Sequence, residues 1–192
     1  MSDAAVLLAA GGGSRFAESG AGPKMLAELR GRPLVTWALA PAIEAGLDEV
    51  VVVTGAIDLA GVLPESVTVV ANPEWWRGQA GSLAVALDYC ARRGHRRALV
   101  ALGDEPGLTA AAWRAVRAAP SGPIVVATYG GRRGHPVRLD AEVWGRLARE
   151  GEVGARSLAG AHPELVVEVE CAGEPEDVDT REDLQRWETL WN

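Results

Sequence analysis

The sequence lacks the features that mark several large classes of proteins. Its two cysteines, Cys90 and Cys171, lie far apart without the spacing of metal ligands, so no disulfide framework is indicated. No apolar run approaches the length of a membrane span. The N-terminus has no basic start, carries Asp3 and soon runs into glycines, which is unlike a signal peptide. We therefore expect a cytoplasmic protein without a membrane partner.

Positive charge is also scarce. The 19 Lys and Arg residues are outnumbered by 26 Asp and Glu residues, and the net charge of -7 argues against a nucleic-acid partner, which needs a basic face. A nucleotide is not excluded, because it needs only a few local cations. Neither an internal repeat nor a low-complexity linker interrupts the 192 residues, of which 48% are hydrophobic. We predict one domain over residues 1–192 with a sizeable core.

Short apolar runs alternate along the chain with segments of helical character. Uninterrupted runs of Val, Leu and Ile are typical of strands that are buried on both faces. Strands are predicted at Ala4–Ala10, Glu49–Thr54, Val67–Ala71, Ala98–Leu102, Ile124–Thr128 and Leu165–Val169. Helices are predicted at Leu34–Ala45, Ala80–Arg92, Ala110–Ala118, Ala141–Arg149 and Arg181–Trp191, with Gly46 and Gly94 as stops and Thr109 and Thr180 as caps. The alternation predicts a Rossmann-like α/β fold with a mostly parallel central sheet and helices on both faces.

The first predicted strand leads into a stretch rich in glycine. Leu8, Ala9 and Ala10 are followed by Gly11, Gly12, Gly13, Ser14 and Arg15, with Lys24 further on. Glycines after a strand allow positive φ, and successive backbone N–H groups there form a concave anion site. The functional interpretation is a phosphate-binding loop to which Arg15 and Lys24 add positive charge. The alternative is a tight strand-to-helix turn with solvated cations.

Two further segments follow strands, at the edge of an open α/β sheet where ligands bind. Asn72 is suited to bond a ribose or a base, and Gly78 and Ser82 lie near a helix start, where an anion is favoured. An ordinary capped loop is the alternative. Asp104 follows the fourth strand, where a lone carboxylate is suited to Mg²⁺. Asp179, just before the last helix, either completes that metal site or caps the helix.

The segments that contain histidine and clustered arginine are interpreted as turns, and no histidine is assigned a catalytic role. The segment Arg132–Val137, with His135, is expected to be a turn that shapes an acceptor pocket, with a β-hairpin connection as the alternative. The basic run Arg92–Arg97 lies at the amino end of its strand, away from the ligand edge, and is expected to be a solvated turn. His95 and His162 receive no role, and no Ser/His/Asp or Cys/His nucleophile is apparent.

Taken together, these segments resemble the nucleotidyltransferases of the molybdenum cofactor. The similarity spans nearly the whole chain, and the order of the motifs carries it. The motifs are Leu8-Ala9-Ala10-Gly11, Ser14-Arg15-Phe16, Pro23-Lys24, Gly31-Arg32-Pro33-Leu34, Gly78 with Ser82-Leu83, Gly103-Asp104-Glu105-Pro106, Gly134-His135-Pro136-Val137, Gly154-Ala155-Arg156 and Asp177-Val178-Asp179-Thr180. The first motif and the Gly-His-Pro-Val and Gly-Ala-Arg pieces are most similar to the cytidylyltransferase branch. The resemblance implies the fold of nucleotide-diphospho-sugar transferases and CTP rather than GTP as the donor.

The resemblance also implies a reaction, in which the phosphate of molybdopterin attacks the α-phosphorus of CTP and pyrophosphate leaves. Arg15, Lys24 and Asp104 would be catalytic, with Lys24 near the α-phosphate, and Asp104 and Asp179 would hold Mg²⁺. The implied nucleotide-binding residues are Leu8, Ala9, Ala10, Gly11, Gly12, Gly13, Ser14, Asn72, Gly78 and Ser82. Residues 132–156 would receive the pterin. A molybdoenzyme or its chaperone is the implied macromolecular partner.

The chain departs from this family pattern at a few positions. The segment Ala17–Gly22 lengthens the distance between the loop and Lys24, and Glu105 and Glu152 stand where Gln and Asp are usual. A guanylyltransferase, or another NTP transferase with a different phosphorylated acceptor, therefore stays an alternative.

Two other functions compete with nucleotidyl transfer. The spacing of Gly11 and Gly13 invites an NAD(P)-dependent oxidoreductase of a small heterocycle, and the family includes members named as such. Phe16, however, occupies the place of the third fingerprint glycine, and no acidic residue closes a second strand about 20 residues later. A non-catalytic nucleotide carrier is the other competitor, against which the paired Asp104 and Asp179 argue.

Overall fold

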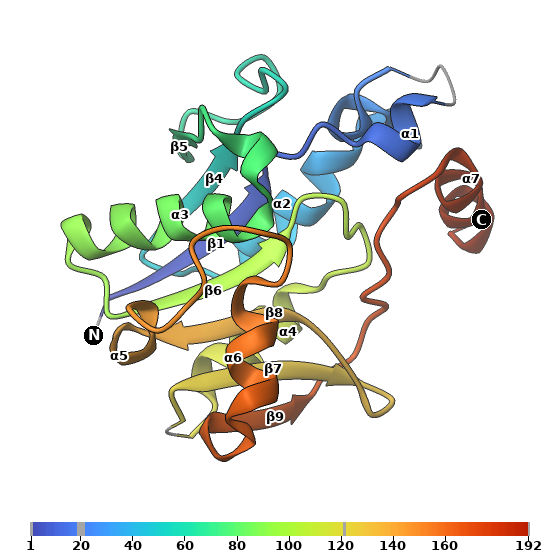
Figure 1. The fold of residues 1–192 in the computed structure, drawn as a ribbon. Helices are drawn as coiled ribbons and strands as arrows, with labels where there is room; N and C mark the ends of the chain where they lie inside the picture. Colours follow the sequence, from blue (N-terminus) through green and yellow to red (C-terminus); the bar gives the residue numbers. More distant parts are fainter. Residues whose placement is uncertain (1, 19–21, 121, 192) are drawn as a thin grey trace.

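The computed structural model describes residues 2–18, 22–120 and 122–191. Its centre is a seven-stranded sheet with the order β5-β4-β1-β6-β8-β7-β9 (Figure 1). The strands are β1 (Asp3–Ala9), β4 (Glu49–Thr54), β5 (Thr68–Ala71), β6 (Arg97–Leu102), β7 (Ile124–Tyr129), β8 (Arg132–Asp140) and β9 (Val166–Glu170), while β2 (Glu28–Leu29) and β3 (Arg32–Pro33) form a separate ribbon. The helices are α1 (Ser14–Glu18), α2 (Leu34–Glu44), α3 (Gln79–Arg93), α4 (Ala110–Ala118), α5 (Ala141–Trp144), α6 (Gly154–Ala161) and α7 (Arg181–Leu190), with short 3-10 turns η1 (Lys24–Leu26), η2 (Trp75–Arg77) and η3 (Pro163–Leu165). The predicted α/β class is confirmed.

β1 lies in the middle of the parallel part of the sheet. It pairs in parallel with β4 and β6, so that Leu7 stands opposite Val52 on one side and Ala101 on the other. All seven residues of β1 are buried, as expected for an apolar strand covered on both faces. Because the three strands are parallel, their carboxyl ends finish at one edge, and the loops that follow them face the same space.

Helices cover both faces of the sheet, and Figure 1 shows α3, α5 and α6 in front of it. On that face Val6 packs in one cluster with Leu87 of α3 and Leu158 of α6. On the other face Leu7 packs with α2 and with Trp113 of α4. Within the described ranges, no helix is both long and apolar enough to cross a membrane.

Most predicted elements are present, and the helix caps at Thr109 and Thr180 are confirmed. The prediction of a turn at Arg132–Val137 is wrong, because this segment belongs to β8, which runs antiparallel between β6 and β7. The alternative, a β-hairpin connection at this segment, is also wrong in its position: Gly130 and Gly131, both at positive φ, form the turn that joins β7 to β8, and Arg132–Val137 is already part of the second strand of the hairpin. Glycine, proline and charged residues in the first half of β8 hide its strand character.

Two helical predictions also differ from the structure. The helix predicted at Ala141–Arg149 ends early, as α5 (Ala141–Trp144), and α6 (Gly154–Ala161) lies where no helix is predicted. Glycine has a low helix propensity, so Gly154 and Gly160 mask a helix that tertiary packing stabilises.

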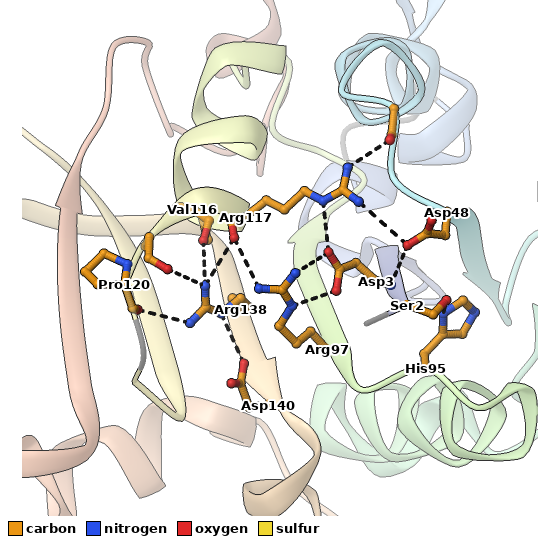
Figure 2. A network of polar contacts seen from close by, with 12 residues as sticks. Ser2, Asp3, Asp48, His95, Arg97, Val116, Arg117, Pro120, Arg138 and Asp140 are labelled. Carbon is orange, nitrogen blue, oxygen red and sulfur yellow. Dashed lines mark hydrogen bonds and ion pairs between the residues drawn. The ribbon is translucent and has the colours of Figure 1, made fainter.

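The amino end of the sheet holds a network of ion pairs, shown in Figure 2. The carboxylate of Asp3 has no exposed surface and accepts hydrogen bonds from Arg97 (2.5 and 2.6 Å) and Arg117 (2.9 Å). His95 is buried, with Nδ1 2.8 Å from Ser2 Oγ and Nε2 2.7 Å from Glu49 Oε2. The prediction of a solvated turn is therefore wrong for His95 and Arg97, which anchor the edge opposite the glycine loop.

Replacing Asp3 with Asn is expected to lower the free energy of unfolding by about 3 kcal/mol. This is the low end of the range for breaking a buried ion pair, because Arg97 and Arg117 stay 23% and 32% exposed. Burial by itself raises the pKa of Asp3, but both guanidinium groups outweigh burial, so the pKa lies below its ordinary value of 3.8. Asp3 thus stabilises the fold above pH 3.8, and this contribution is lost as the pH falls through its lowered pKa.

Urea unfolding at several pH values measures this contribution. Asp48 provides the matched control, because its carboxylate also contacts Arg117 but is 48% exposed; Asp48→Asn should cost less than about 1 kcal/mol. Equal losses of unfolding free energy in the two variants would contradict the role of the buried Asp3 carboxylate. The same holds if Asp3→Asn stays less stable than wild type well below pH 3.8.

Candidate active site

A cavity of about 470 Å³ opens at the carboxyl edge of β1, where the sequence predicts a ligand site. It is lined by Leu8, Ala10, Gly11, Gly12, Gly13, Ser14, Arg15, Lys24, Met25, Trp75, Trp76, Gly78, Gln79, Ser82, Leu102, Asp104, Glu152, Asp177 and Asp179. The structure thus brings most of the predicted site residues together in one place, referred to below as the first cavity. Ala9 and Asn72 lie outside its lining.

The glycine loop allows Lys24 to enter the first cavity. Gly13 has a φ of +60°, which favours glycine, and a Cβ there would lie only 2.8 Å from Cβ of Lys24. Lys24 begins η1 and is buried in the cavity wall. The lengthened segment Ala17–Gly22 therefore still delivers Lys24 to the site, although residues 19–21 lie outside the described residues.

Charged side chains form a chain of contacts across the first cavity. The Lys24 Nζ atom lies 2.5 Å from Oδ2 of Asp104 and 3.2 Å from Oδ1 of Asp179. The other oxygen of Asp179 accepts a 2.5 Å bond from Arg15. The exposed fraction of these side chains rises from about a tenth at Lys24 and Asp104 to 34% at Asp179 and 74% at Arg15. Lys24 and Asp104 are the buried part of this chain, and Arg15 is its solvent end.

Asp179 is brought to the site by the segment that follows β9. This segment crosses back to the carboxyl edge and ends in α7, beside α1 (Figure 1). Val178 is fully buried, and its N–H donates to the carbonyl of Asp104 at 2.9 Å. Trp187 of α7 packs so closely on Gly107 that a Cβ there would lie 2.4 Å from its ring. Asp179 follows Val178 directly, so these contacts hold its carboxylate near Lys24.

The protonation of the pair follows from its burial. Burial by itself lowers the pKa of Lys24, but the carboxylates of Asp104 and Asp179 outweigh it and raise the pKa. Burial raises the pKa of Asp104, and the Lys24 ammonium counteracts that rise. Lys24 is therefore a charged ammonium at neutral pH, and its charge favours the ionised form of Asp104, although burial prevails and the net pKa of Asp104 stays above its ordinary value.

The donor set in the first cavity fits a divalent cation that takes few protein ligands. Oδ1 of Asp104 is buried and has no hydrogen-bond partner among the described residues. Asp179 is the second carboxylate on the same side of the cavity. In the described part of the chain, no group of three or more His, Cys, Asp or Glu side chains is able to hold a metal. Two carboxylates are nevertheless enough for Mg²⁺, which completes its shell with phosphate oxygens and water.

Asn72 does not line the first cavity but positions a residue that does. It is buried, its amide nitrogen lies 3.0 Å from Ser82 Oγ, and its carbonyl oxygen accepts the N–H of Glu74. Gly78 has a φ of +100°, and a Cβ there would lie 2.5 Å from the carbonyl oxygen of Gly151. Glycine at this position therefore lets the segment 150–153 pack against the start of α3.

A second cavity, also of about 470 Å³, adjoins the first and shares Leu8, Gln79, Leu102 and Glu152 with it. Its remaining lining is Leu83, Val100, Ile124, Val126, Arg133, Gly134, His135, Val137, Leu139, Val153, Gly154, Ala155, Arg156, Ala159 and Gly160. The walls are mostly apolar, with charged or titratable side chains at four points, Arg133, His135, Glu152 and Arg156. Arg132 of the predicted acceptor region, residues 132–156, lies in a different hollow. The members of this region that line the second cavity are Arg133, Gly134, His135, Val137, Leu139 and Glu152–Arg156.

The sequence analysis gave no individual role to three groups that the structure brings to these cavities. Gln79 and Glu152 line both cavities, and Asp177 lines the first. The signal for Gln79 is its position directly after Gly78 and before a predicted helix. Nothing in the sequence indicates that Glu152 would meet Gln79, because 72 residues separate them.

A glycine loop, a buried lysine and two carboxylates at the carboxyl edge of an α/β sheet are a donor set suited to a nucleoside triphosphate, and the class of protein that they indicate is the nucleotidyltransferases. Residues 5–166 match the family described as the MobA-like NTP transferase domain. The match covers most of the chain, and the protein therefore belongs to this family. Asp179 and α7 lie beyond the matched segment.

Individual relatives match nearly the whole chain. The nicotine blue oxidoreductase of Paenarthrobacter nicotinovorans is 38% identical over 196 residues, covering 94% of both chains. The crystal structure of Rv0371c from Mycobacterium tuberculosis H37Rv has a TM-score of 0.86 at 30% identity and covers 98% of both chains; its manganese complex has a TM-score of 0.81 at 28% identity and covers 98% and 99%. Mth528, a nucleotidyl transferase from Methanothermobacter thermautotroptrophicus, has a TM-score of 0.82 at 25% identity and covers 99% of this chain and 97% of its own.

Proposed function

We propose that the protein transfers CMP from CTP to the phosphate of a molybdopterin-type acceptor and releases pyrophosphate. The observation that carries this proposal is the meeting of the glycine loop, Lys24 and two carboxylates in the first cavity. CTP as the donor and molybdopterin as the acceptor rest on the sequence motifs of the cytidylyltransferase branch.

The chain's own residues are suited to bind and neutralise the triphosphate. Backbone N–H groups of Gly11–Ser14 and the exposed Arg15 would bind the β- and γ-phosphates. Lys24 would shift its ammonium toward the α-phosphate, where negative charge develops in the transition state. An acceptor phosphate oxygen then bonds to the α-phosphorus. The bond from that phosphorus to the bridging oxygen of the β-phosphate breaks, and its electron pair leaves with pyrophosphate.

Asp104 and Asp179 would hold a divalent cation, Mg²⁺ in this proposal. The unpartnered Oδ1 of Asp104 supports this role, as does the manganese complex of Rv0371c. When bound, the cation supplies charge neutralisation at the phosphates and helps to orient them. Lys24 bonds both carboxylates in this structure, so metal and nucleotide binding would redirect its ammonium.

The second cavity would take the acceptor. Its apolar walls suit a flat heterocycle, and it joins the first cavity where Leu8 and Leu102 line both. An acceptor bound there would carry its phosphate toward the donor. A molybdoenzyme or its chaperone would then receive the product as the macromolecular partner.

A thermal-shift panel of CTP, GTP, ATP, UTP and NADPH, each with and without Mg²⁺, tests the donor. CTP at 100 times its Kd should stabilise the native state by about 2.7 kcal/mol and raise Tm by about 5–10 °C. Without Mg²⁺ the shift should be smaller, because the carboxylates then repel the phosphates. A larger shift with GTP would change the donor, and a shift only with NADPH would overturn nucleotidyl transfer.

The second candidate function is an NAD(P)-dependent oxidoreductase of a small heterocycle. The name of the 38% identical relative, nicotine blue oxidoreductase, is the observation that favours it. Loss of the 340 nm absorbance of NADPH in the presence of a heterocyclic acceptor would support this candidate. Pyrophosphate release from CTP over many turnovers would support the first and exclude a purely carrying role.

A further inference from the structure

Glu105 and His135 form a pair that the transfer step described above does not use. Nδ1 of His135 lies 2.7 Å from Oε1 of Glu105, and Oε2 of Glu105 accepts the backbone N–H of Leu102 at 3.2 Å. The side chain of Glu105 is 4% exposed and that of His135 is 22% exposed. The hydroxyl of Tyr129 donates to the carbonyl oxygen of His135 at 2.5 Å. The ring and the backbone of His135 are therefore both held in place.

An irregularity in β8 turns His135 out of the regular strand pairing. Gly134 pairs with Ala127 of β7, and Val137 pairs with Val126. His135 and Pro136 therefore face no partner on β7. Such bulges re-aim side chains and are frequent next to active sites. His135 lines the second cavity.

One edge of the imidazole is free for a ligand. Nδ1 is bonded to Glu105, and Nε2 makes no hydrogen bond to any residue that the structure describes. Burial by itself lowers the pKa of His135, and the positive charge of Arg156 lowers it further. The carboxylates of Glu105 and Asp104 raise this pKa and outweigh both effects, so the net pKa of His135 is raised. Because Glu105 adjoins Asp104, His135 lies on the side of the second cavity that is nearest the first. Arg156, in the first turn of α6, lines the same cavity.

We propose that Nε2 of His135 donates a hydrogen bond to the phosphomonoester of the acceptor, and that Glu105 is the positioning residue that orients the imidazole. This inference rests on the proposed function, because it requires an acceptor that carries a phosphate. A phosphate bound by His135 would lie beside the junction of the two cavities, where it has to be in order to attack the donor. Arg156 would supply further positive charge to the same anion.

Phenyl phosphate, a flat ring with a phosphomonoester, is the probe for this contact. The sequence has only three histidines, so the side-chain ¹H–¹⁵N spectrum is simple to assign with His135→Gln and His162→Gln. His162 is the matched control, because its Nδ1 also contacts a glutamate, Glu164, at 2.9 Å, while its 41% exposed ring lies outside both cavities. Phenol serves as the ligand without a phosphate.

Phenyl phosphate should shift the ring signals of His135 but not those of His162. Phenol should shift the His135 signals less than phenyl phosphate does. His135→Gln should raise the Kd of phenyl phosphate about tenfold, whereas His162→Gln should leave it unchanged. Glu105→Gln should raise this Kd and should also lower the pKa of His135 toward 6.5. If the pair had only a structural role, the two changes would not occur together.

Stationary His135 signals in the wild-type protein, or an unchanged Kd in a folded His135→Gln variant, would overturn the inference. The wild-type titration needs no variant and decides the question even if His135→Gln fails to fold. The CTP thermal shift, measured on the same samples, tests the donor site separately. If CTP gives no thermal shift but phenyl phosphate still shifts the His135 signals, CMP transfer is rejected and the contact between His135 and a phosphate is still supported.

Discussion

Asp104→Asn is expected to lower pyrophosphate release from CTP, with a molybdopterin acceptor present, by at least about 10³-fold. The substitution keeps the shape of the side chain but removes the buried charge that bonds Lys24 at 2.5 Å and the oxygen that is free for a metal. The same variant should lose the part of the CTP thermal shift that depends on Mg²⁺. This second measurement reads out the metal site without requiring turnover.

Asp88 offers a matched control for Asp104. It is also an aspartate paired with a cation, Arg149, but it is 48% exposed and lies outside the first cavity. Asp88→Asn should keep both turnover and the Mg²⁺-dependent shift. If Asp104→Asn retains full turnover, or loses turnover but keeps the Mg²⁺ effect on CTP binding, Asp104 does not hold the metal.

Lys24→Met is expected to lower kcat by about 10²–10³-fold, with a smaller effect on KM for CTP. The reason is that, in the proposed mechanism, the Lys24 ammonium meets the α-phosphate, where negative charge develops in the transition state. Lys24→Arg should not restore the rate, because a planar guanidinium does not replace a compact ammonium in a buried site. Lys24 is the only lysine in the sequence, so reductive ¹³C-methylation adds one side-chain signal, which CTP should shift.

The stability of the Lys24 variant gives an independent test of the buried pair. Removing the ammonium leaves Asp104 buried without its partner, which should cost about 3 kcal/mol. Burial raises the pKa of Asp104 above its ordinary value of 3.8. Without the Lys24 ammonium the pKa of Asp104 should rise further, so the stability of Lys24→Met should fall as the pH rises from 3.8 through that raised pKa. The double variant Lys24→Met with Asp104→Asn should be more stable at neutral pH than Lys24→Met alone. If the double variant is no more stable, the two side chains are not coupled.

Local patterns were sufficient for the parallel half of the sheet. The apolar run at Ala4–Ala10 predicts β1 within one residue, and the cap at Thr109 marks the start of α4. Such features depend on hydrophobic periodicity and on bonds between near neighbours in the chain, so a sequence displays them directly. They also suffice to assign Asp104 and the glycine loop to one edge, because parallel strands end together.

The antiparallel half was harder to predict because its partners are distant or its local composition is misleading. β8 contains Gly134 and Pro136, and its strand character comes from pairing with β6 and β7 on either side. The pair of Glu105 and His135 joins residues 30 positions apart across two strands. No local pattern indicates such a contact, since only the order of the strands in the sheet creates it.

By itself, the sequence determined the α/β class, the glycine loop and the presence of Asp104 at the ligand edge. Only the tertiary structure decided that Lys24, reached through the lengthened segment Ala17–Gly22, lies between Asp104 and Asp179. The physical reason is that Asp179 comes from the far end of the chain and is held by the packing of Val178 and α7. Contacts between residues 80 and 155 positions apart are set by how the elements pack together, and not by the sequence near either partner.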